Sequence, residues 1–279
     1  MIQAFIVDWG GVLMRTVDIR PRLTWERRLG LPPCDLADIF FGSPAWERAQ
    51  FGHATLDDVW DELASRTGLD EREVAALRQD FWAGDRLDQD LIALLHQLRE
   101  RGLATALLSN HAASLPDELL GLGLDGLFDV TVISALEGVA KPDPEIYRRA
   151  LERLDVSPFD AIFVDDYGRN VEAARSLGMA AVRFRGAPHL RRELAAAGIT
   201  LDGLPRGPLP AIRAVVFDWG GVISPLTFSA RTREWEIRLG LAEGVLDEVL
   251  WGSWWKLLEI GAVSQEEFDD HVARGLGLP

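Results

Sequence analysis

The sequence has little cysteine, no long apolar run and no excess of positive charge. Cys34 is the only cysteine, so an internal disulfide is excluded, and this usage is typical of the reducing cytoplasm. No apolar run reaches membrane-spanning length, and the N-terminus lacks the basic and apolar segments of a secretory signal. We therefore expect a cytoplasmic protein with no membrane partner.

The charge balance limits the classes of partner. The formal net charge is -15, which argues against nucleic acid, because binding to DNA or RNA depends on clustered Lys and Arg. An acidic protein that handles an anionic substrate needs local cations or a metal ion. The chain has only two lysines, Lys141 and Lys256, so Lys141 is a candidate for a specific role. A hydrophobic content of 48% is normal for a globular core.

Short apolar strands alternate with helical segments over much of the chain. The first strand lies within residues 5–13 and ends at Asp8. Further strands are expected at 103–108, 128–133, 161–164 and 180–184, and helices at 88–101, 116–121, 144–154, 170–177 and 190–197. This alternation predicts an α/β fold with a doubly wound parallel sheet and right-handed crossovers.

The segment between the first strand and residue 87 has a different pattern. No strand-like alternation occurs between about residues 15 and 85, and helices are predicted at 21–29, 35–41, 56–65 and 71–82. Aromatic residues recur throughout it. They are expected to form a helical core, and some of them to line a lid over the Asp8 crevice. The segment therefore predicts an inserted α-helical cap.

The end of the chain repeats its beginning. The strand and Asp-Trp-Gly-Gly motif around Asp8 return around Asp218, and further identities follow at the same offset of 210 residues. After a one-residue deletion the match continues to Gly277, the counterpart of Gly68. A Pro- and Gly-rich stretch precedes the repeat and predicts an extended linker.

These patterns predict three parts. The first domain spans residues 1–204, with its cap at about 15–85. The linker spans residues 205–210. Residues 211–279 form a partial second copy, with the first strand and most of a cap. This copy lacks equivalents of the polar residues that follow the later strands, so we expect it to be inert and to pack on the first domain or on a second chain. A homodimer or a strand swap is the predicted form.

Polar residues follow four predicted strands of the first domain. They are Asp8, the pair Ser109 and Asn110, the loop residue Lys141, and the pair Asp165 and Asp166. Because the carboxyl ends of parallel strands meet at one edge of a sheet, we expect these residues to converge. Three neighbouring carboxylates require a cation, and all-oxygen ligation favours Mg²⁺.

This arrangement indicates phosphoryl chemistry. Asp8 is the candidate nucleophile toward phosphorus. Ser109 and the amide of Asn110 are candidates for holding phosphate oxygens, and Lys141 for balancing the charge that develops on them. The expected substrate is a small phosphorylated metabolite whose identity the cap residues do not reveal.

The constellation resembles the haloacid dehalogenase (HAD) superfamily, which consists mostly of Mg²⁺-dependent aspartyl-phosphate hydrolases. The resemblance covers about residues 3–200 and implies a helical cap of the C1 type. It is strongest to the branch with sugar-phosphate phosphatases and the N-terminal phosphatase domain of soluble epoxide hydrolase. It implies that Asp8, the Gly10 carbonyl and Asp166 bind the metal, with Asp165 in support. It also implies that Asp8 and Lys141 are catalytic and that Ser109 binds phosphate.

One position departs from the family pattern. Phosphatases of this superfamily usually carry a second aspartate two residues after the nucleophile, which moves the proton of the leaving group. Here that residue is Gly10. General acid–base catalysis contributes about 10²–10⁴ in rate. We therefore expect a slower phosphatase, one restricted to good leaving groups, or one with a substitute such as His111, His53 or water.

Other activities fit the sequence less well. Phosphonoacetaldehyde hydrolases need a cap lysine, and residues 15–85 contain none. Metal-free 2-haloacid dehalogenases lack the Asp-Asp pair that a cation requires. A non-catalytic binding or regulatory role is the main alternative, and both Gly10 and the partial second copy favour it.

Overall fold

The computed structural model describes residues 2–197, 199, 235–241, 245–251, 253–259 and 263–277. The chain forms two compact units, one of residues 1–31 and 35–204 and the other of residues 32–34 and 205–279. The predicted linker and the repeated strand with Asp218 lie outside the described residues.

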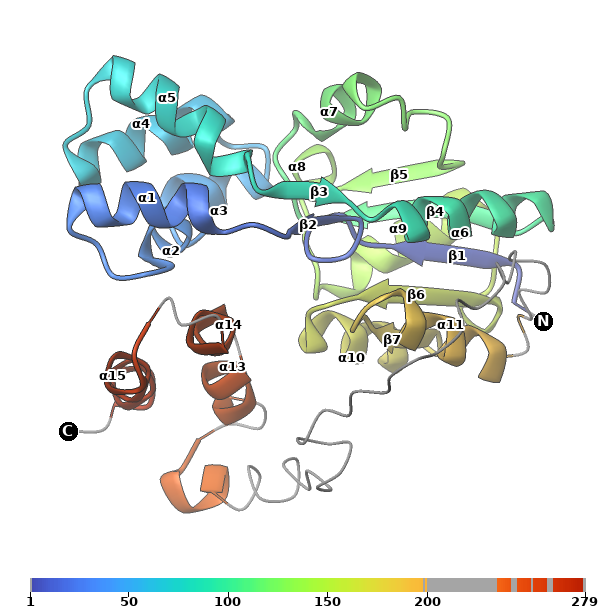
Figure 1. The fold of residues 1–279 in the computed structure, drawn as a ribbon. Helices are drawn as coiled ribbons and strands as arrows, with labels where there is room; N and C mark the ends of the chain where they lie inside the picture. The colour runs from blue at the N-terminus through green and yellow to red at the C-terminus, as the bar shows by residue number, and fades with distance from the viewer. Residues whose placement is uncertain are drawn as a thin grey trace, which may run out of the picture. The chain divides into compact units, whose positions relative to one another are not determined.

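A parallel five-stranded sheet forms the centre of the first unit (Figure 1). Its strand order is β5-β4-β1-β6-β7. The strands are β1 Ala4–Val7, β4 Ala104–Ser109, β5 Val130–Ile133, β6 Ala161–Asp165 and β7 Ala180–Arg183. The register pairs Ala4 with both Ala104 and Ala161, so β1 lies between β4 and β6. The predicted α/β fold with a doubly wound parallel sheet is confirmed.

Alternation along β1 divides the core between the two faces of the sheet. Phe5 and Val7 belong to one apolar cluster, and Ala4 and Ile6 belong to the other. Helices α6 Gln89–Glu100, α7 Leu115–Gly121 and α11 Ala187–Ala196 cover the first face. Helices α9 Pro144–Leu154 and α10 Gly168–Ser176 cover the second. The short helices α8 Ser134–Glu137 and η1 Pro158–Asp160 lie in connections.

The cap is a helical block between two short strands, β2 Met14–Thr16 and β3 Asp85–Leu87. Its helices are α1 Arg20–Leu29, α2 Asp35–Phe41, α3 Pro44–Gln50, α4 Leu56–Thr67 and α5 Glu71–Trp82. They enclose an aromatic-rich core that includes Trp25, Phe40, Trp60 and Phe81. The prediction that aromatic residues form a helical core is thus confirmed for these positions.

Three elements of this region differ from the prediction. The sequence predicted no strand between residues 15 and 85, but β2 and β3 pair as an antiparallel ribbon that leads into and out of the cap. Each has only three residues, which is too short to show alternation. Helix α3 was also missed, although Ser43 caps it and Pro44 opens it.

The ribbon is tied together where it enters the cap. The carbonyl of Gly84 accepts hydrogen bonds from the N–H groups of Val17 and Asp18, at 2.9 and 3.2 Å. A Cβ atom at position 84 would lie 1.7 Å from the Asp18 carbonyl oxygen. Only glycine allows the two segments to approach this closely.

The described residues of the second unit are helical. A helical turn at residues 235–239 is followed by α13 Val245–Trp251, α14 Ser253–Glu259 and α15 Gln265–Gly275. Across the parts of the chain that the structure describes, no helix combines the length and apolar character needed to cross a membrane.

Candidate active site

The sheet brings the predicted polar residues to one edge. Asp8 follows β1 directly, Ser109 ends β4 and Asp165 ends β6. Because β1 lies between β4 and β6, these residues stand at neighbouring strand ends. Lys141 comes from the loop between α8 and α9, which follows β5.

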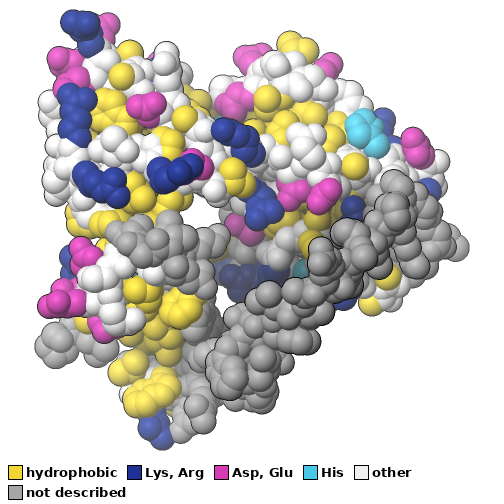
Figure 2. Space-filling model, in the orientation of Figure 1, with side chains coloured by type: hydrophobic (Ala, Val, Ile, Leu, Met, Phe, Trp, Pro, Cys, Tyr) yellow, Lys and Arg dark blue, Asp and Glu magenta, His cyan; other side chains and the backbone are white. Residues whose placement is uncertain are grey.

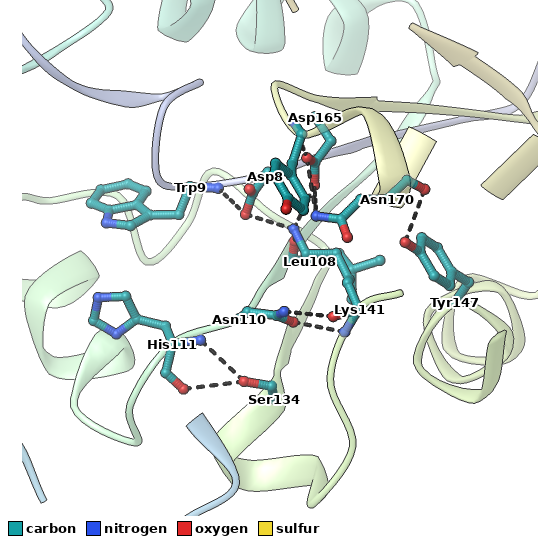
Figure 3. Close-up of polar contacts among 11 residues, drawn as sticks. Asp8, Trp9, Leu108, Asn110, His111, Ser134, Lys141, Tyr147, Asp165 and Asn170 are labelled. Carbon is teal, nitrogen blue, oxygen red and sulfur yellow. Dashed lines mark hydrogen bonds and ion pairs between the residues drawn. The ribbon is translucent and has the colours of Figure 1, made fainter. Parts of the chain in front are cut away.

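The ammonium group of Lys141 joins two of the carboxylates (Figure 3). Its Nζ atom lies 2.9 Å from Asp8 Oδ1 and 2.7 Å from Asp165 Oδ2. The same group donates to the Leu108 carbonyl oxygen at 2.9 Å. Lys141 is only 5% exposed. A buried ion pair of this kind persists only when each charge has close partners, and this lysine is held between β1, β4 and β6.

Burial and crowding change the protonation of these groups. Burial is the main cause that raises the pKa of Asp8 to about 7, Asp165 and Asp166 raise it further, and Lys141 opposes them. Burial lowers the pKa of Lys141, but the charges of Asp8 and Asp165 outweigh it, so the net shift is upward. The site therefore holds more negative charge than one ammonium group neutralises.

The carboxylate of Asp165 is held on several sides. Besides Lys141, it accepts hydrogen bonds from the Tyr167 N–H at 2.7 Å and from Asn170 Nδ2, which lies 3.1 Å from both carboxylate oxygens. The hydroxyl of Tyr147 donates to the Asn170 carbonyl at 3.0 Å. Sequence reasoning did not assign Asn170 or Tyr147 to the site, because these contacts depend on how α9 and α10 pack.

Asp166 has a different environment. The residue as a whole is exposed to solvent, but its carboxyl group is partly buried. This burial and the charge of Asp165 raise the pKa of Asp166. Its carboxylate lies against Gly11, where a Cβ atom would be 2.0 Å from Asp166 Oδ2. Gly11 also has a φ of 75°, which favours glycine. The second glycine of the motif is therefore a requirement of the site.

The three carboxylates fit a divalent cation. One oxygen from each of Asp8, Asp165 and Asp166 lies within 4.8 Å of the others. Hard cations such as Mg²⁺ prefer oxygen ligands of this kind. Burial is the main cause of the raised pKa of Asp8, and the nearby charges of Asp165 and Asp166 add to it, so a bound cation would favour the ionised carboxylate.

Asn110 and Ser109 occupy the end of β4. The Asn110 side chain accepts from the Lys141 N–H and donates to the Lys141 carbonyl, both at 2.8 Å (Figure 3). It thus fixes the backbone of the lysine, which precedes a cis peptide bond to Pro142. Ser109 is buried at the strand end. Both residues lie where the sequence placed them, and the Asn110 side chain serves to position Lys141.

A family model for haloacid dehalogenase-like hydrolases matches residues 2–178. The chain belongs to this family. The resemblance seen in the sequence is confirmed, and the protein is a hydrolase.

Phosphatases are among its relatives. A sesquiterpene phosphatase of Aspergillus oryzae is 35% identical over 182 residues, which cover 63% of this chain and 87% of that protein. A phosphoserine phosphatase of Thermus thermophilus is 42% identical over 168 residues, which cover 58% of this chain and 68% of that protein. Four other relatives are longer, and the match covers only 18% to 36% of their length.

A solved structure shares the fold. A HAD family enzyme of Bacteroides thetaiotaomicron, crystallised with magnesium and inorganic phosphate, has a TM-score of 0.54 and 21% identity. The match covers 68% of this chain and 99% of that one. At this identity the likeness concerns the fold.

His111 of the hydrolase packs toward the cap. Its ring makes an edge contact with Trp46 of α3, with centroids 5.6 Å apart, and Figure 3 shows it extending away from Lys141. Burial lowers the pKa of His111, which favours the neutral ring at pH 7. Its backbone is tied to Ser134, whose Oγ accepts from the His111 N–H at 3.1 Å. His53, the other candidate from the sequence, is exposed in a cap loop.

The cap of the hydrolase also contacts the sheet domain at Gly52. A Cβ atom there would lie 2.4 Å from the Ala135 carbonyl oxygen of α8, and Gly52 has a φ of 76°. Together with the Trp46–His111 contact, this close approach brings α3 beside the loop that follows β4. The aromatic cap therefore borders the edge of the sheet where the carboxylates meet.

Proposed function

We propose that this hydrolase is a Mg²⁺-dependent phosphatase of small phosphorylated metabolites that works through an aspartyl-phosphate on Asp8. The observation that carries the proposal is the bridge from Lys141 to Asp8 and Asp165, with Asp166 beside them. Three carboxylates and one ammonium leave two negative charges, which one divalent cation neutralises. The names of two relatives, a sesquiterpene phosphatase and a phosphoserine phosphatase, support the reaction class.

The chain's own residues account for most of the first step. Lys141 and the Trp9 N–H both hold Asp8 Oδ1, at 2.9 and 2.7 Å, so we assign the attack on phosphorus to Oδ2. A P–O bond to Asp8 forms and the bond to the leaving oxygen breaks. We assign Ser109 and the Asn110 N–H to the binding of the phosphoryl oxygens. Asp8 and Asp166, with the Gly10 carbonyl, would hold Mg²⁺, and Asp165 would support them.

The second step releases phosphate. Water attacks phosphorus, the P–O bond to Asp8 breaks, and Asp8 returns as a carboxylate. When bound, Mg²⁺ would supply positive charge beside the phosphoryl group. Gly10 offers no carboxyl group to protonate the leaving oxygen, so we propose that the proton comes from water and that good leaving groups react faster. His111 is a weak substitute, because its ring is turned to Trp46.

The cap favours substrates with an apolar body. Phe41 and Trp82 are 40% and 38% exposed. The ring centroids of Phe41 and Trp46 lie 5.2 Å apart, and Trp46 in turn contacts His111 beside the site. Exposed aromatic groups at the border of a site bind apolar surface. Among phosphate monoesters, we therefore expect higher kcat/KM for long-chain alkyl or prenyl phosphates than for sugar phosphates.

Turnover of p-nitrophenyl phosphate tests the proposal. The wild type with Mg²⁺ is expected to release phosphate, and Asp8→Asn is expected to lose activity by at least about 10³-fold, because the nucleophile is removed. EDTA is expected to abolish turnover and added Mg²⁺ to restore it. Equal rates for both proteins on this ester and on a panel of prenyl, sugar and nucleotide phosphates would favour a non-catalytic role.

We also propose that residues 211–279 are a partial second copy of the hydrolase. Two matching contacts support this. Glu26 and Glu236 are both buried, and their Oε1 atoms accept from the N–H groups of Leu36 and Leu246, each at 3.1 Å. These four residues stand at the same offset of 210.

The helix caps of the two segments also agree. Thr55 and Asp58 form a capping box at the start of α4, and Ser264 and Glu267 form one at the start of α15. Their offset of 209 includes the one-residue deletion seen in the sequence. The helices α13, α14 and α15 therefore correspond in order to α2, α3 and α4.

A further inference from the structure

Three aromatic side chains of the cap, Trp46, Phe41 and Trp82, lie in a continuous row that we call the aromatic wall. The ring centroids of Trp46 and Phe41 are 5.2 Å apart, and those of Phe41 and Trp82 are 6.0 Å apart. Trp46 contacts His111 beside the site, and Trp82 is the last residue of α5. The wall therefore extends from the loop after β4 to the end of α5.

The α5 end of the aromatic wall is held by Arg22 of α1. The guanidinium carbon of Arg22 lies 4.3 Å from the ring centroid of Phe81 and 5.7 Å from that of Trp82. The Arg22 Nε donates to the Phe81 carbonyl oxygen at 2.6 Å. Carbonyl groups in the last turn of a helix have no partner within the helix. Arg22 thus helps to determine how α5 ends and where Trp82 projects.

The same guanidinium group pairs with Asp85 of β3. Its Nη2 lies 3.0 and 3.2 Å from the two carboxylate oxygens, and the hydroxyl of Thr16 in β2 donates to Asp85 Oδ1 at 2.6 Å. The side chains of Arg22 and Asp85 are only 12% and 11% exposed. An ion pair that is largely removed from water needs further hydrogen bonds to both charges, and both have them here. The pair therefore ties the end of α5 to both strands of the ribbon.

The ribbon continues directly from the segment that carries the candidate nucleophile (Figure 1). β2 follows Asp8 after a tight turn, in which the Gly11 N–H donates to the Met14 carbonyl oxygen at 2.9 Å. Thr16 of β2 stands opposite Asp85 of β3 in the register of the ribbon. A series of short contacts thus connects the Asp8 turn through the ion pair to the aromatic wall.

We propose that Arg22 and Asp85 are positioning residues for substrate selection, because they hold the aromatic wall in place relative to Asp8. The proposal rests on the phosphatase function proposed above. The ligand is a phosphate monoester with a hydrocarbon chain, whose phosphate lies at the carboxylates and whose chain lies along the wall. Arg22 and Asp85 act through Trp82 and do not touch the substrate themselves.

The ratio of kcat/KM for octyl phosphate to that for butyl phosphate tests the proposal. Both esters have an alkyl leaving group, so the ratio measures contacts with the hydrocarbon chain. The wild type is expected to prefer octyl phosphate by at least about tenfold, because each buried methylene group contributes up to about fourfold. Arg22→Gln and Trp82→Ala are each expected to lower this preference by at least about fivefold, since a displaced or missing contact no longer holds the chain.

Two further variants examine the ion pair itself. Asp85→Asn retains an oxygen acceptor for Thr16 and Arg22, and it is expected to lower the preference by at least about twofold, because the charge is lost. This milder variant tests the pair where Arg22→Gln does not fold. The double variant is expected to lower the preference no further than Arg22→Gln alone, because the two residues act as one unit.

The matched control is another ion pair between the same two helices. Arg28, near the other end of α1, pairs with Glu73 near the start of α5. Figure 2 shows basic side chains, in dark blue, among yellow hydrophobic side chains on the face of the cap over α1 and α5. Exposed pairs contribute little, so Arg28→Gln is expected to keep the preference for octyl phosphate within about twofold of wild type.

An equal loss on both esters in Arg22→Gln would assign the ion pair a merely structural role and overturn the proposal. A wild type that hydrolyses both esters without a preference would overturn it too. Binding of octylphosphonate and butylphosphonate, measured by calorimetry with Mg²⁺, makes the same comparison without turnover. If neither ester is hydrolysed but the wild type prefers octylphosphonate and Arg22→Gln does not, the phosphatase function fails and the role of the ion pair in ligand selection stands.

Discussion

Two adjacent glycines follow the candidate nucleophile, and they meet different demands. Gly11 has a positive φ and lies against the Asp166 carboxylate, so a side chain there has no space. A Cβ atom at Gly10 would have no heavy-atom neighbour within 4 Å, and the φ of Gly10 is outside the left-handed range. The position that departs from the usual phosphatase pattern is therefore also the one that accepts a side chain.

Gly10→Asp is expected to increase the rate on esters with poor leaving groups. The new carboxyl group would supply a proton to the leaving oxygen, which is worth about 10²–10⁴ in favourable cases, and we expect at least about tenfold in kcat for an alkyl phosphate. The gain on p-nitrophenyl phosphate is expected to be smaller, because its leaving group needs little protonation. Steady-state kinetics on both esters measures the difference.

Gly11→Ala is the matched variant for this experiment. Its methyl group would displace Asp166, so activity on both esters is expected to fall and more Mg²⁺ to be needed for half-maximal rate. A Gly10→Asp protein with unchanged leaving-group dependence would show that the proton is not limiting.

Most site residues could be predicted because they end strands. The alternation of apolar strands and helices predicts a parallel sheet, and the carboxyl ends of its strands, where Asp8, Ser109 and Asp165 lie, meet at one edge. Asn170 and Tyr147 could not be assigned in this way. Their roles depend on the rotation of α10 and α9 against the sheet, which side-chain packing determines and local sequence does not.

At the scale of elements, the β2–β3 ribbon decides how the cap joins the sheet domain. Gly84→Ala is expected to lower the free energy of unfolding by about 1–3 kcal/mol, because its Cβ would lie 1.7 Å from the Asp18 carbonyl oxygen. It is also expected to lower kcat/KM, since the cap would be displaced from the site. Urea unfolding and kinetics measure the two effects.

Gly121 provides the control for this variant. It ends α7, and a Cβ there would have no neighbour within 4 Å. Gly121→Ala is expected to leave activity unchanged and to raise stability by up to about 1 kcal/mol. Equal stability of the two variants would contradict the assigned role of Gly84.

Glu137 connects the helices on either side of the Lys141 loop. This residue ends α8 and pairs with Arg149 and Arg153 of α9, at 3.1 and 2.7 Å. Burial acts to raise the pKa of Glu137, but hydrogen bonds from Arg153 and Arg149 outweigh it and lower the pKa. A carboxyl group with a lowered pKa stabilises the folded chain above its unfolded pKa, and this contribution is lost as the pH falls through the folded pKa.

Glu137→Gln is therefore expected to destabilise the chain in a pH-dependent way. Because solvent screens these partly exposed ion pairs, the free energy of unfolding is expected to fall by only about 1 kcal/mol at pH 7. The difference between this variant and the wild type in the free energy of unfolding is expected to become smaller below about pH 4, where glutamate is protonated in the unfolded chain. Thermal unfolding at a series of pH values measures it, and a difference that does not change with pH would contradict the ion-pair account.

At the scale of the molecule, the candidate site belongs to one of the two compact units. A chain that ends at Leu204 keeps the three apolar clusters and each of the proposed site residues. We expect it to retain kcat/KM for p-nitrophenyl phosphate within about twofold of the full chain, since no proposed group is removed. Size-exclusion chromatography and kinetics of the two forms provide the test. A loss of activity in the shorter chain would show that residues 205–279 contribute to catalysis.

The large-scale plan was partly visible in the sequence. Alternating strands and helices predict the sheet, and the helical insertion predicts the cap, because each pattern extends over many residues. The proposed correspondence of α13, α14 and α15 with α2, α3 and α4 rests on the sequence repeat in the same way. The hydrogen bond from Trp25 to Asp80 does not follow from it, because this contact depends on how α5 packs across α1.

The scarcity of lysine has a practical consequence. Lys141 is one of two lysines in the chain, and it is buried and held by two carboxylates, whose charges outweigh burial and raise its pKa. Amine-reactive dyes and cross-linkers attack the neutral amine, so they are expected to spare Lys141 while the chain is folded. Surface attachment through amines would then leave the proposed nucleophile untouched, and modification of Lys141 would report unfolding of the sheet edge.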